Sequence, residues 1–232
     1  MRKSLLLSFI LCILCSMVAC SSDDDDTKGN ENGNGNSSGS VYRPKFVDLG
    51  LPSGVLWADC NLGAKTPYEA GNYYAYGEIE TKSDYSWSTY KFWKNKKITK
   101  YTGEDGKKNL DAADDVARVY LGEKCRIPTY DDYMELKRNC SWSWISEYHG
   151  ANGFLFKGPN GNTIFLPAAG IKAFNYRYGY GANAGYWLSE VSSNNGDYTM
   201  AFGMMSTGSM LDTRAGTSSR VAGMNVRPVA VK

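Results

Sequence analysis

The chain has 232 residues, with 26 lysines and arginines against 24 aspartates and glutamates, so its formal net charge is +2. This balance excludes nucleic acid as the expected partner, because binding a phosphate backbone requires an extended basic surface. The densest basic cluster, Lys94 to Lys97, is more typical of a solvated loop.

Residues 1–19 have the pattern of a secretory signal peptide. Arg2 and Lys3 precede an apolar segment of about 16 residues, shorter than the ~20 that a membrane-spanning helix needs. The segment ends in Met-Val-Ala-Cys20, which resembles a bacterial lipobox with methionine where leucine is commoner. That resemblance implies cleavage before Cys20 and acylation of this residue. The alternative is a plain transmembrane anchor.

Residues 20–40 are predicted to be a disordered tether. No hydrophobic residue occurs from Ser21 to Ser40, and such a stretch cannot bury enough apolar surface to fold. Its first part, Ser21 to Asp26, resembles the acidic tag that exports some lipoproteins to the outer face of the outer membrane. We therefore expect an outer-membrane protein that faces outward and contacts the lipid through acylated Cys20.

The remaining residues, 41–232, are predicted to form one domain. Phe46–Leu49 and Val55–Ala58 read as two strands around the turn at Pro52-Ser53-Gly54. Another strand is expected over Gly71–Gly77, and Lys82–Asn109 reads as a long surface loop.

Two short helices are expected next. One covers residues 110–120 and stops at Gly122, and the other begins with a capping box formed by Thr129 and Asp132. Four acidic residues lie near these helices: Asp111, Asp114, Asp131 and Asp132. Acidic residues favour the first turn of a helix, so we expect no metal here.

The rest of the domain is rich in β-strand patterns. Strands at 154–156 and 163–166 flank Asn160-Gly161, a strong hairpin signal. Further strands are expected at 198–202 and 225–229. Short strands around a small helical layer predict an irregular α+β fold.

Six ordered sequence blocks support a family resemblance. They are Leu51–Ala64, Gly71–Glu78, Arg126–Thr129, Cys140–Trp144, Asn162–Gly170 and Val226–Val229. Together they resemble the Fibrobacter succinogenes major paralogous domain family, which is typical of surface proteins. That family is distantly similar to the formylglycine-generating, sulfatase-modifying enzymes, and this similarity implies a C-type-lectin-like fold.

The resemblance does not carry the chemistry of those enzymes. They need a reactive cysteine pair near the C-terminus, but the last cysteine here is Cys140, and iron-dependent relatives need more histidines than the single His149. His149 reads as a turn residue. No proline in the chain stands between two acidic or amide residues, the triplet that calcium-dependent lectins use to bind the ion. We therefore expect no enzyme, metal or cofactor.

Three cysteines remain in the domain, and two interpretations of them stay open. A Cys60–Cys140 disulfide would close a loop of about 80 residues, which the chain-entropy model rates at ~4–5 kcal/mol. A bridge from Cys125 to Cys140 is disfavoured, because a helix ~15 Å long separates them. The alternative is three buried free thiols. Cys125 stands where the family usually has an aromatic residue, so it is expected to be free.

The candidate ligand-binding surface lies between residues 174 and 187, where glycines alternate with aromatic and amide side chains. Its members are Phe174, Tyr176, Arg177, Tyr178, Tyr180, Asn183, Tyr186 and Trp187. Such composition is typical of binding loops. In the competing interpretation Tyr186 and Trp187 begin a core strand.

The predicted function is a non-catalytic recognition module that binds a glycan or a surface protein. A structural or accessory subunit of a surface appendage is the alternative.

Overall fold

A computed structural model describes residues 43–194, 197–212 and 215–232. All described residues belong to one compact unit, Ser40–Lys232. The predictions for the signal peptide, for acylated Cys20 and for the tether therefore lie outside the described residues. No helix in the described part of the chain is long and apolar enough to cross a membrane.

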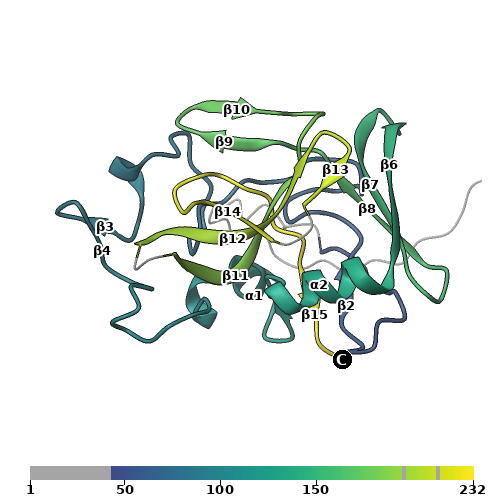
Figure 1. The fold of residues 1–232 in the computed structure, drawn as a ribbon, viewed down its shortest axis with the longest axis horizontal. Helices are drawn as coiled ribbons and strands as arrows, with labels where there is room; N and C mark the ends of the chain where they lie inside the picture. The colour runs from purple at the N-terminus through teal and green to yellow at the C-terminus, as the bar shows by residue number, and fades with distance from the viewer. Residues whose placement is uncertain (1–42, 195–196, 213–214) are drawn as a thin grey trace, which may run out of the picture. The chain divides into compact units, whose positions relative to one another are not determined.

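The described strands form five small antiparallel sheets (Figure 1). The first contains β1 (Phe46–Asp48), β2 (Leu56–Ala58), β15 (Val229–Ala230) and β5 (Cys125–Arg126), in that order. The second contains β6 (Ser141–Tyr148), β7 (Ala151–Lys157) and β8 (Thr163–Pro167). The third contains β11 (Gly185–Asn194), β12 (Asp197–Thr207) and β13 (Met210–Leu211), with β14 (Gly216–Ser219) also on β12. Two hairpins complete the set, β3 (Trp93–Lys94) with β4 (Lys97–Ile98) and β9 (Ile171–Ala173) with β10 (Tyr176–Tyr178).

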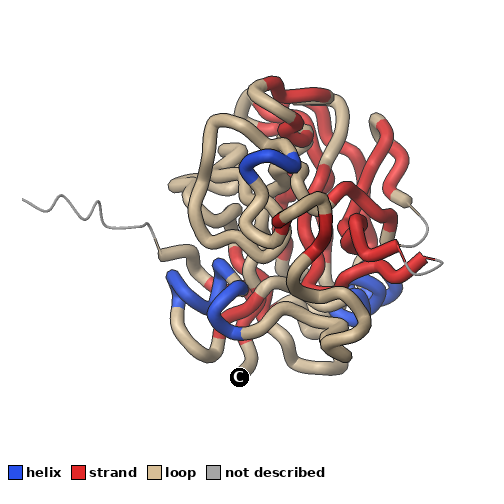
Figure 2. Tube along the Cα trace, turned by 90° about the vertical axis from the view of Figure 1, so that its left-hand side faces the viewer, coloured by secondary structure: helices blue, strands red, loops and turns tan. Residues whose placement is uncertain are grey.

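Two α-helices and two 3-10 turns lie among these strands in the described ranges. They are α1 (Val116–Leu121), α2 (Tyr130–Asn139), η1 (Trp87–Thr89) and η2 (Ala112–Asp114). Loops make up much of one side of the domain, and strands gather on the other (Figure 2). This mixture of short antiparallel strands and two short helices confirms the predicted α+β class.

The second predicted helix begins where its sequence requires. The Thr129 side chain accepts a hydrogen bond from the Asp132 backbone, and the Asp132 carboxylate accepts one from the Thr129 backbone. This reciprocal cap satisfies N–H groups that have no partner inside the helix. The other predicted helix was placed too early, because the chain forms η2 first and α1 starts only after Asp115, whose carboxylate caps it.

Two further strand predictions have different outcomes. The Asn160-Gly161 turn joins β7 and β8, with Gly161 at a φ of 88°, so the predicted hairpin is confirmed. The strand expected over Gly71–Gly77 is wrong, since only one bridge, from Tyr74 to Met224, forms there. Residues of this segment form isolated hydrogen bonds with Arg220, Met224 and Asn225 rather than a ladder of strand pairs.

Two buried arginines organise the polar part of the core. Arg227 donates to the Asn61 side chain at 2.9 Å, to the Ala58 carbonyl at 3.1 Å and to the Phe165 carbonyl at 2.8 Å. It therefore joins the β1–β2 region, β8 and the C-terminal segment. Arg220 donates to the carbonyl of Lys100 and to the Tyr90 hydroxyl, and so it fixes the long 82–109 loop on the core.

The predicted Cys60–Cys140 disulfide is wrong. Both residues, together with Cys125, are buried free cysteines. The thiol of Cys60 points to the carbonyl of Ala64 at 3.5 Å, whereas Cys140 ends α2 and packs in an apolar cluster with Leu136. A longer loop between two cysteines raises the stabilisation that the chain-entropy model assigns to a disulfide, but it does not bring the two side chains together. The arrangement in the structure is that of the competing interpretation, three buried thiols.

Candidate functional site: an aromatic hairpin surface

The β9–β10 hairpin presents a group of exposed aromatic side chains. Among the described residues, eight large hydrophobic side chains are strongly exposed, and four of these belong to this hairpin and its flank. They are Phe174 at 61% exposure, Tyr176 at 62%, Tyr178 at 52% and Tyr180 at 57%. Together with Arg177, we refer to these side chains as the hairpin surface.

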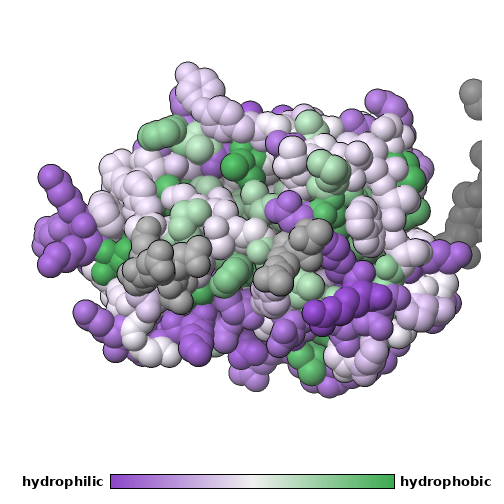
Figure 3. All heavy atoms as spheres, viewed as in Figure 1, coloured by the Kyte–Doolittle hydropathy of each residue, from purple (hydrophilic) through white to green (hydrophobic). Residues whose placement is uncertain are grey.

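Exposure of this kind has an energetic meaning. Aromatic side chains each bury 150–250 Å² in typical cores and dominate interface energies, so leaving four in water on one hairpin is unfavourable for an isolated domain. Clusters of exposed apolar surface mark binding sites more often than scattered single residues do. In Figure 3 purple hydrophilic spheres gather along the lower rim of the face, whereas the upper part below β9 and β10 is mostly pale.

The hairpin is held firmly on the rest of the domain. Phe174 and Tyr85 exchange two backbone hydrogen bonds, at 3.0 Å and 2.9 Å. Lys172 and Gly223 exchange two more, at 2.7 Å and 2.8 Å. Gly170 precedes β9 at a φ of 70°, and a Cβ there would lie 2.2 Å from the Tyr178 carbonyl oxygen. The aromatic side chains therefore sit on a preorganised backbone.

Arg177 is ordered by stacking rather than by an ion pair. Its guanidinium carbon lies 3.7 Å from the centre of the Tyr180 ring. Such cation–π contacts stabilise by about 0.5–1 kcal/mol at exposed sites. Burial raises the pKa of Tyr73, and a hydrogen bond from Arg177 to its hydroxyl opposes that shift.

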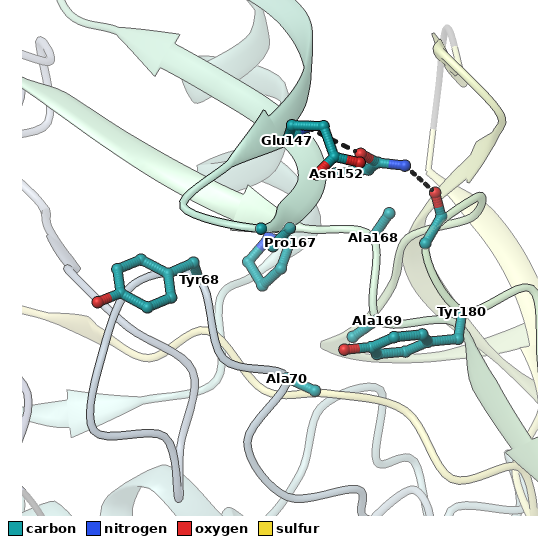
Figure 4. A pocket seen from close by; sticks show the side chains of 11 residues that line it. Tyr68, Ala70, Glu147, Asn152, Pro167, Ala168, Ala169 and Tyr180 are labelled. Atoms are coloured by element: carbon teal, nitrogen blue, oxygen red, sulfur yellow. Dashed lines mark hydrogen bonds between the residues drawn. The ribbon is translucent and has the colours of Figure 1, made fainter. Parts of the chain in front are cut away.

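A small pocket lies beside the hairpin surface, between Tyr68 and Tyr180 (Figure 4). Pro167, Ala168 and Ala169, at the end of β8 and just after it, line its inner wall, and its volume is about 90 Å³. Sites for whole small molecules measure roughly 300–1,000 Å³, so this tyrosine pocket accepts only part of a ligand.

Asn152 fixes the upper edge of the tyrosine pocket. Its carboxamide oxygen accepts from the Glu147 backbone at 3.0 Å, and its amide donates to the Gly181 carbonyl at 2.8 Å (Figure 4). Both ends of the Asn152 carboxamide are thus hydrogen-bonded, and they hold the β6–β7 turn beside the segment that follows β10. The Glu147 carboxylate, by contrast, has no hydrogen-bond or ion-pair partner within the described residues.

His149 lies in the turn next to this pocket, as predicted. Its ring stacks on Tyr68 with centroids 4.9 Å apart and meets Tyr148 edge-on at 4.8 Å. Tyr148 in turn stacks on Phe165 at 4.5 Å. The contacts of His149 are those of a packing residue that supports the Tyr68 side of the tyrosine pocket.

The structure separates the predicted binding residues into two groups. Phe174, Tyr176, Arg177, Tyr178 and Tyr180 are exposed together, as the prediction requires. Asn183 is half-buried, and its carboxamide oxygen accepts from the Gly208 backbone at 3.1 Å.

Tyr186 and Trp187 were predicted wrongly as surface contacts. Both are 1% exposed on β11, and the competing interpretation of a core strand is correct. The Tyr186 hydroxyl donates to the Pro167 carbonyl at 2.7 Å, and the Trp187 indole donates to the Tyr74 carbonyl at 2.7 Å. Burial raises the pKa of Tyr186 to about 12. Tyr186 thereby holds Pro167, which lines the tyrosine pocket.

Sequence reasoning missed Tyr68, Glu147, Asn152 and Lys172. Tyr68 lies in an irregular loop far from the hairpin in sequence, and no local pattern connects the two. The only signal for Tyr68 in the sequence was that it is an aromatic residue in a loop that contains glycine and proline.

Three of the four acidic residues near the helices, Asp111, Asp114 and Asp132, have basic partners. Asp114 binds Lys91 at 2.8 Å and Lys100 at 2.6 Å, while Asp132 pairs with Arg126. Within residues 43–194, 197–212 and 215–232 no group of three or more histidine, cysteine or acidic side chains is arranged to hold a metal ion.

No family model, curated protein or solved structure matches this chain. The function is therefore inferred from the chemistry of the surface itself.

Proposed function

We propose that this protein is a non-catalytic recognition module that binds a carbohydrate through the hairpin surface and the tyrosine pocket. The observation that carries the proposal is the set of four exposed aromatic side chains on one firmly anchored hairpin. Rigid aromatic side chains lose little conformational entropy when they bind a ligand.

The surface offers what a sugar ring requires. Flat aromatic faces pack against the apolar faces of sugars, and hydroxyl or carboxylate groups at their edges bond the sugar hydroxyls. The hydroxyls of Tyr68, Tyr176, Tyr178 and Tyr180 have no hydrogen-bond partner within the described part of the domain. The Glu147 carboxylate stands beside the same pocket, and it is equally available.

The state of the thiols supports a non-catalytic role. Burial raises the pKa of Cys60 to about 12 and that of Cys140 to about 11, and it raises the pKa of Cys125 as well. A thiol nucleophile reacts as its thiolate and therefore needs a lowered pKa and access to substrate.

The proposal includes membership in the Fibrobacter succinogenes major paralogous domain family, with its C-type-lectin-like fold. Its support is that three of the resembling blocks contact one another through Arg227, which lies in the last block and bonds residues 58 and 61 of the first block and residue 165 of the fifth. It also includes attachment to the outer membrane through acylated Cys20, on the outward face, supported by the sequence pattern alone.

A broad glycan array tests the central part of the proposal. The full chain, purified in detergent, should give saturable binding with calcium and equally with a chelator. Tyr178→Ala and Tyr180→Ala should each reduce binding, while Trp142→Ala serves as the matched control, because Trp142 is an exposed aromatic residue on β6. No binding to any glycan, or equal loss in all three variants, would contradict the proposal.

A second candidate function is that of a subunit in a surface assembly, and β6 favours it. This strand has eight residues and stands at an edge of its sheet as described, with Ser141, Trp142 and Ser143 exposed. An unpaired edge strand is a template for a strand from another polypeptide. Sedimentation of the full chain with its candidate partner subunit tests this: Ile145→Pro should abolish association if β6 pairs, because proline cannot donate to the ladder.

A further inference from the structure

A second hollow of about 460 Å³ borders the hairpin surface on the side away from Glu147, and it is lined by basic and aromatic residues. Lys172, Arg177 and Lys82 line it together with Tyr73 and Tyr85, and its lining contains no acidic residue. We refer to it as the cationic pocket. It lies next to the exposed aromatic side chains of the hairpin surface, because Arg177 belongs to both.

Two of these three cations lack an anionic partner. Lys82 is neutralised by Glu78, with nitrogen and oxygen 2.9 Å apart. Neither Lys172 nor Arg177 takes part in an ion pair with any described residue. The pocket therefore has two positive charges that no carboxylate of the described chain offsets.

Aromatic faces hold both charges in place. The Lys172 ammonium lies 4.9 Å from the centre of the Tyr73 ring and 5.8 Å from that of Tyr85. The Arg177 guanidinium lies on Tyr180. Cation–π contacts use the charge of the group but not its N–H donors at the edge, so the donors of Lys172, and those of Arg177 that do not bond the Tyr73 hydroxyl, remain available to a ligand. An ion pair would have occupied them.

The backbone positions the lysine rigidly. Lys172 exchanges two hydrogen bonds with Gly223, and a Cβ at Gly223 would lie 2.6 Å from the Tyr85 ring, so close packing requires glycine there. The neighbouring Tyr85 hydroxyl donates to the Tyr73 carbonyl at 2.6 Å. The two rings that hold the ammonium are thus connected to each other, and the site exists before any ligand binds.

Two chain segments contribute to the lining of both the cationic and the tyrosine pocket. In the first segment Tyr68 and Ala70 line the tyrosine pocket and residues 71–73 line the cationic pocket, and in the second Tyr180 lines the tyrosine pocket and Arg177 the cationic pocket. The stacked Arg177–Tyr180 pair therefore separates the two hollows. A ligand lying across this pair would place one end near Glu147 and the other near Lys172.

We propose that the protein selects acidic carbohydrates, with the anionic group bound by Lys172 and Arg177 and a sugar ring on Tyr180. This inference rests on the proposed carbohydrate-binding function and narrows its ligand class to sugars that carry a carboxylate or a sulfate. A guanidinium fork binds either group through two parallel hydrogen bonds.

The test compares ligands that differ only in charge. Calorimetry would measure binding of an oligogalacturonate and of its neutral methyl ester to the full chain. The free acid should bind about tenfold tighter, as one or two charge-assisted hydrogen bonds imply. Sulfated dextran and plain dextran form a second pair, and a preference for the charged member of only one pair identifies the anion.

Three variants complete the test. Lys172→Met removes the ammonium but keeps an unbranched side chain over the two rings. Arg177→Lys keeps the positive charge but loses the two parallel N–H donors of the guanidinium. Both variants should remove most of the preference for the charged ligand. Lys97→Met removes an exposed lysine on β4 and should leave the preference intact.

Equal binding of acid and ester, or an equal effect of Lys97→Met, would overturn the inference while leaving carbohydrate binding itself intact. Failure to bind every charged and neutral saccharide would instead contradict the proposed function. Unchanged thermal melting of each variant would exclude misfolding as the cause of a lost preference.

Discussion

Replacing Arg227 with methionine tests whether one buried guanidinium holds the core together. Its three neutral acceptors are the Asn61 side chain and the carbonyls of Ala58 and Phe165. The residue is completely buried, and burial lowers the pKa of its guanidinium. Methionine occupies similar space without donating to any of the three oxygens.

Two opposing effects determine the magnitude. Each buried acceptor that loses its partner costs about 1–3 kcal/mol, so three cost about 3–9 kcal/mol. Removing a charge from the interior recovers several kcal/mol of desolvation free energy. We expect a net destabilisation of about 2–4 kcal/mol. For a domain of this size that corresponds to a melting temperature lower by about 4–16 °C.

Urea unfolding followed by tryptophan fluorescence would measure the free energy of unfolding. Arg138→Met is the matched control, because Arg138 is exposed at the end of α2, and we expect a change of about 0.5 kcal/mol or less. If Arg227→Met were as stable as the unmodified protein, the three hydrogen bonds would not be what stabilises this core.

Three further predictions concern the thiols, a buried acid and the membrane anchor. Alkylation in denaturant without reductant, followed by peptide mass spectrometry, should find Cys60, Cys125 and Cys140 all modified, whereas a crosslinked peptide pair would show a disulfide. Burial raises the pKa of Glu190 above its ordinary 4.5, so its contribution to stability is present below that pH and is lost as the pH rises through the folded-state pKa. Glu190→Gln should therefore become more stable relative to the unmodified protein between pH 4 and pH 7 in urea unfolding, and a difference independent of pH would refute this. Cys20→Ala should move the protein from the membrane fraction to the soluble fraction, and continued sedimentation with membranes would exclude a lipid anchor.

Local signals in the sequence were sufficient where a few adjacent residues determine the backbone. The Asn160-Gly161 pair suits the positive φ of a tight turn, and the capping box at Thr129 satisfies helix N–H groups within four residues. The exposed tyrosines of the hairpin were found for a similar reason. Glycines interleaved with aromatic residues are characteristic of binding loops in any fold.

Features that depend on distant pairing were not predictable. The β9–β10 hairpin turns at Phe174 and Asn175, and it is Phe174, a residue that rarely adopts a positive φ, that takes a φ of 53°. Trp187 is buried because its backbone donates to Asn225 and its indole to Tyr74, both far away in sequence. The pairing of Tyr68 with Tyr180 across a pocket likewise requires the folded chain.

Radical footprinting of the full chain, with and without the best-binding glycan from the array, tests the central claim most directly. The modification of Tyr176, Tyr178 and Tyr180 should fall when the glycan is bound, because their faces become covered, while the modification of Trp142 on β6 should not change. Protection of Trp142 alone, or equal modification of all four residues in both samples, would contradict carbohydrate binding at the hairpin surface.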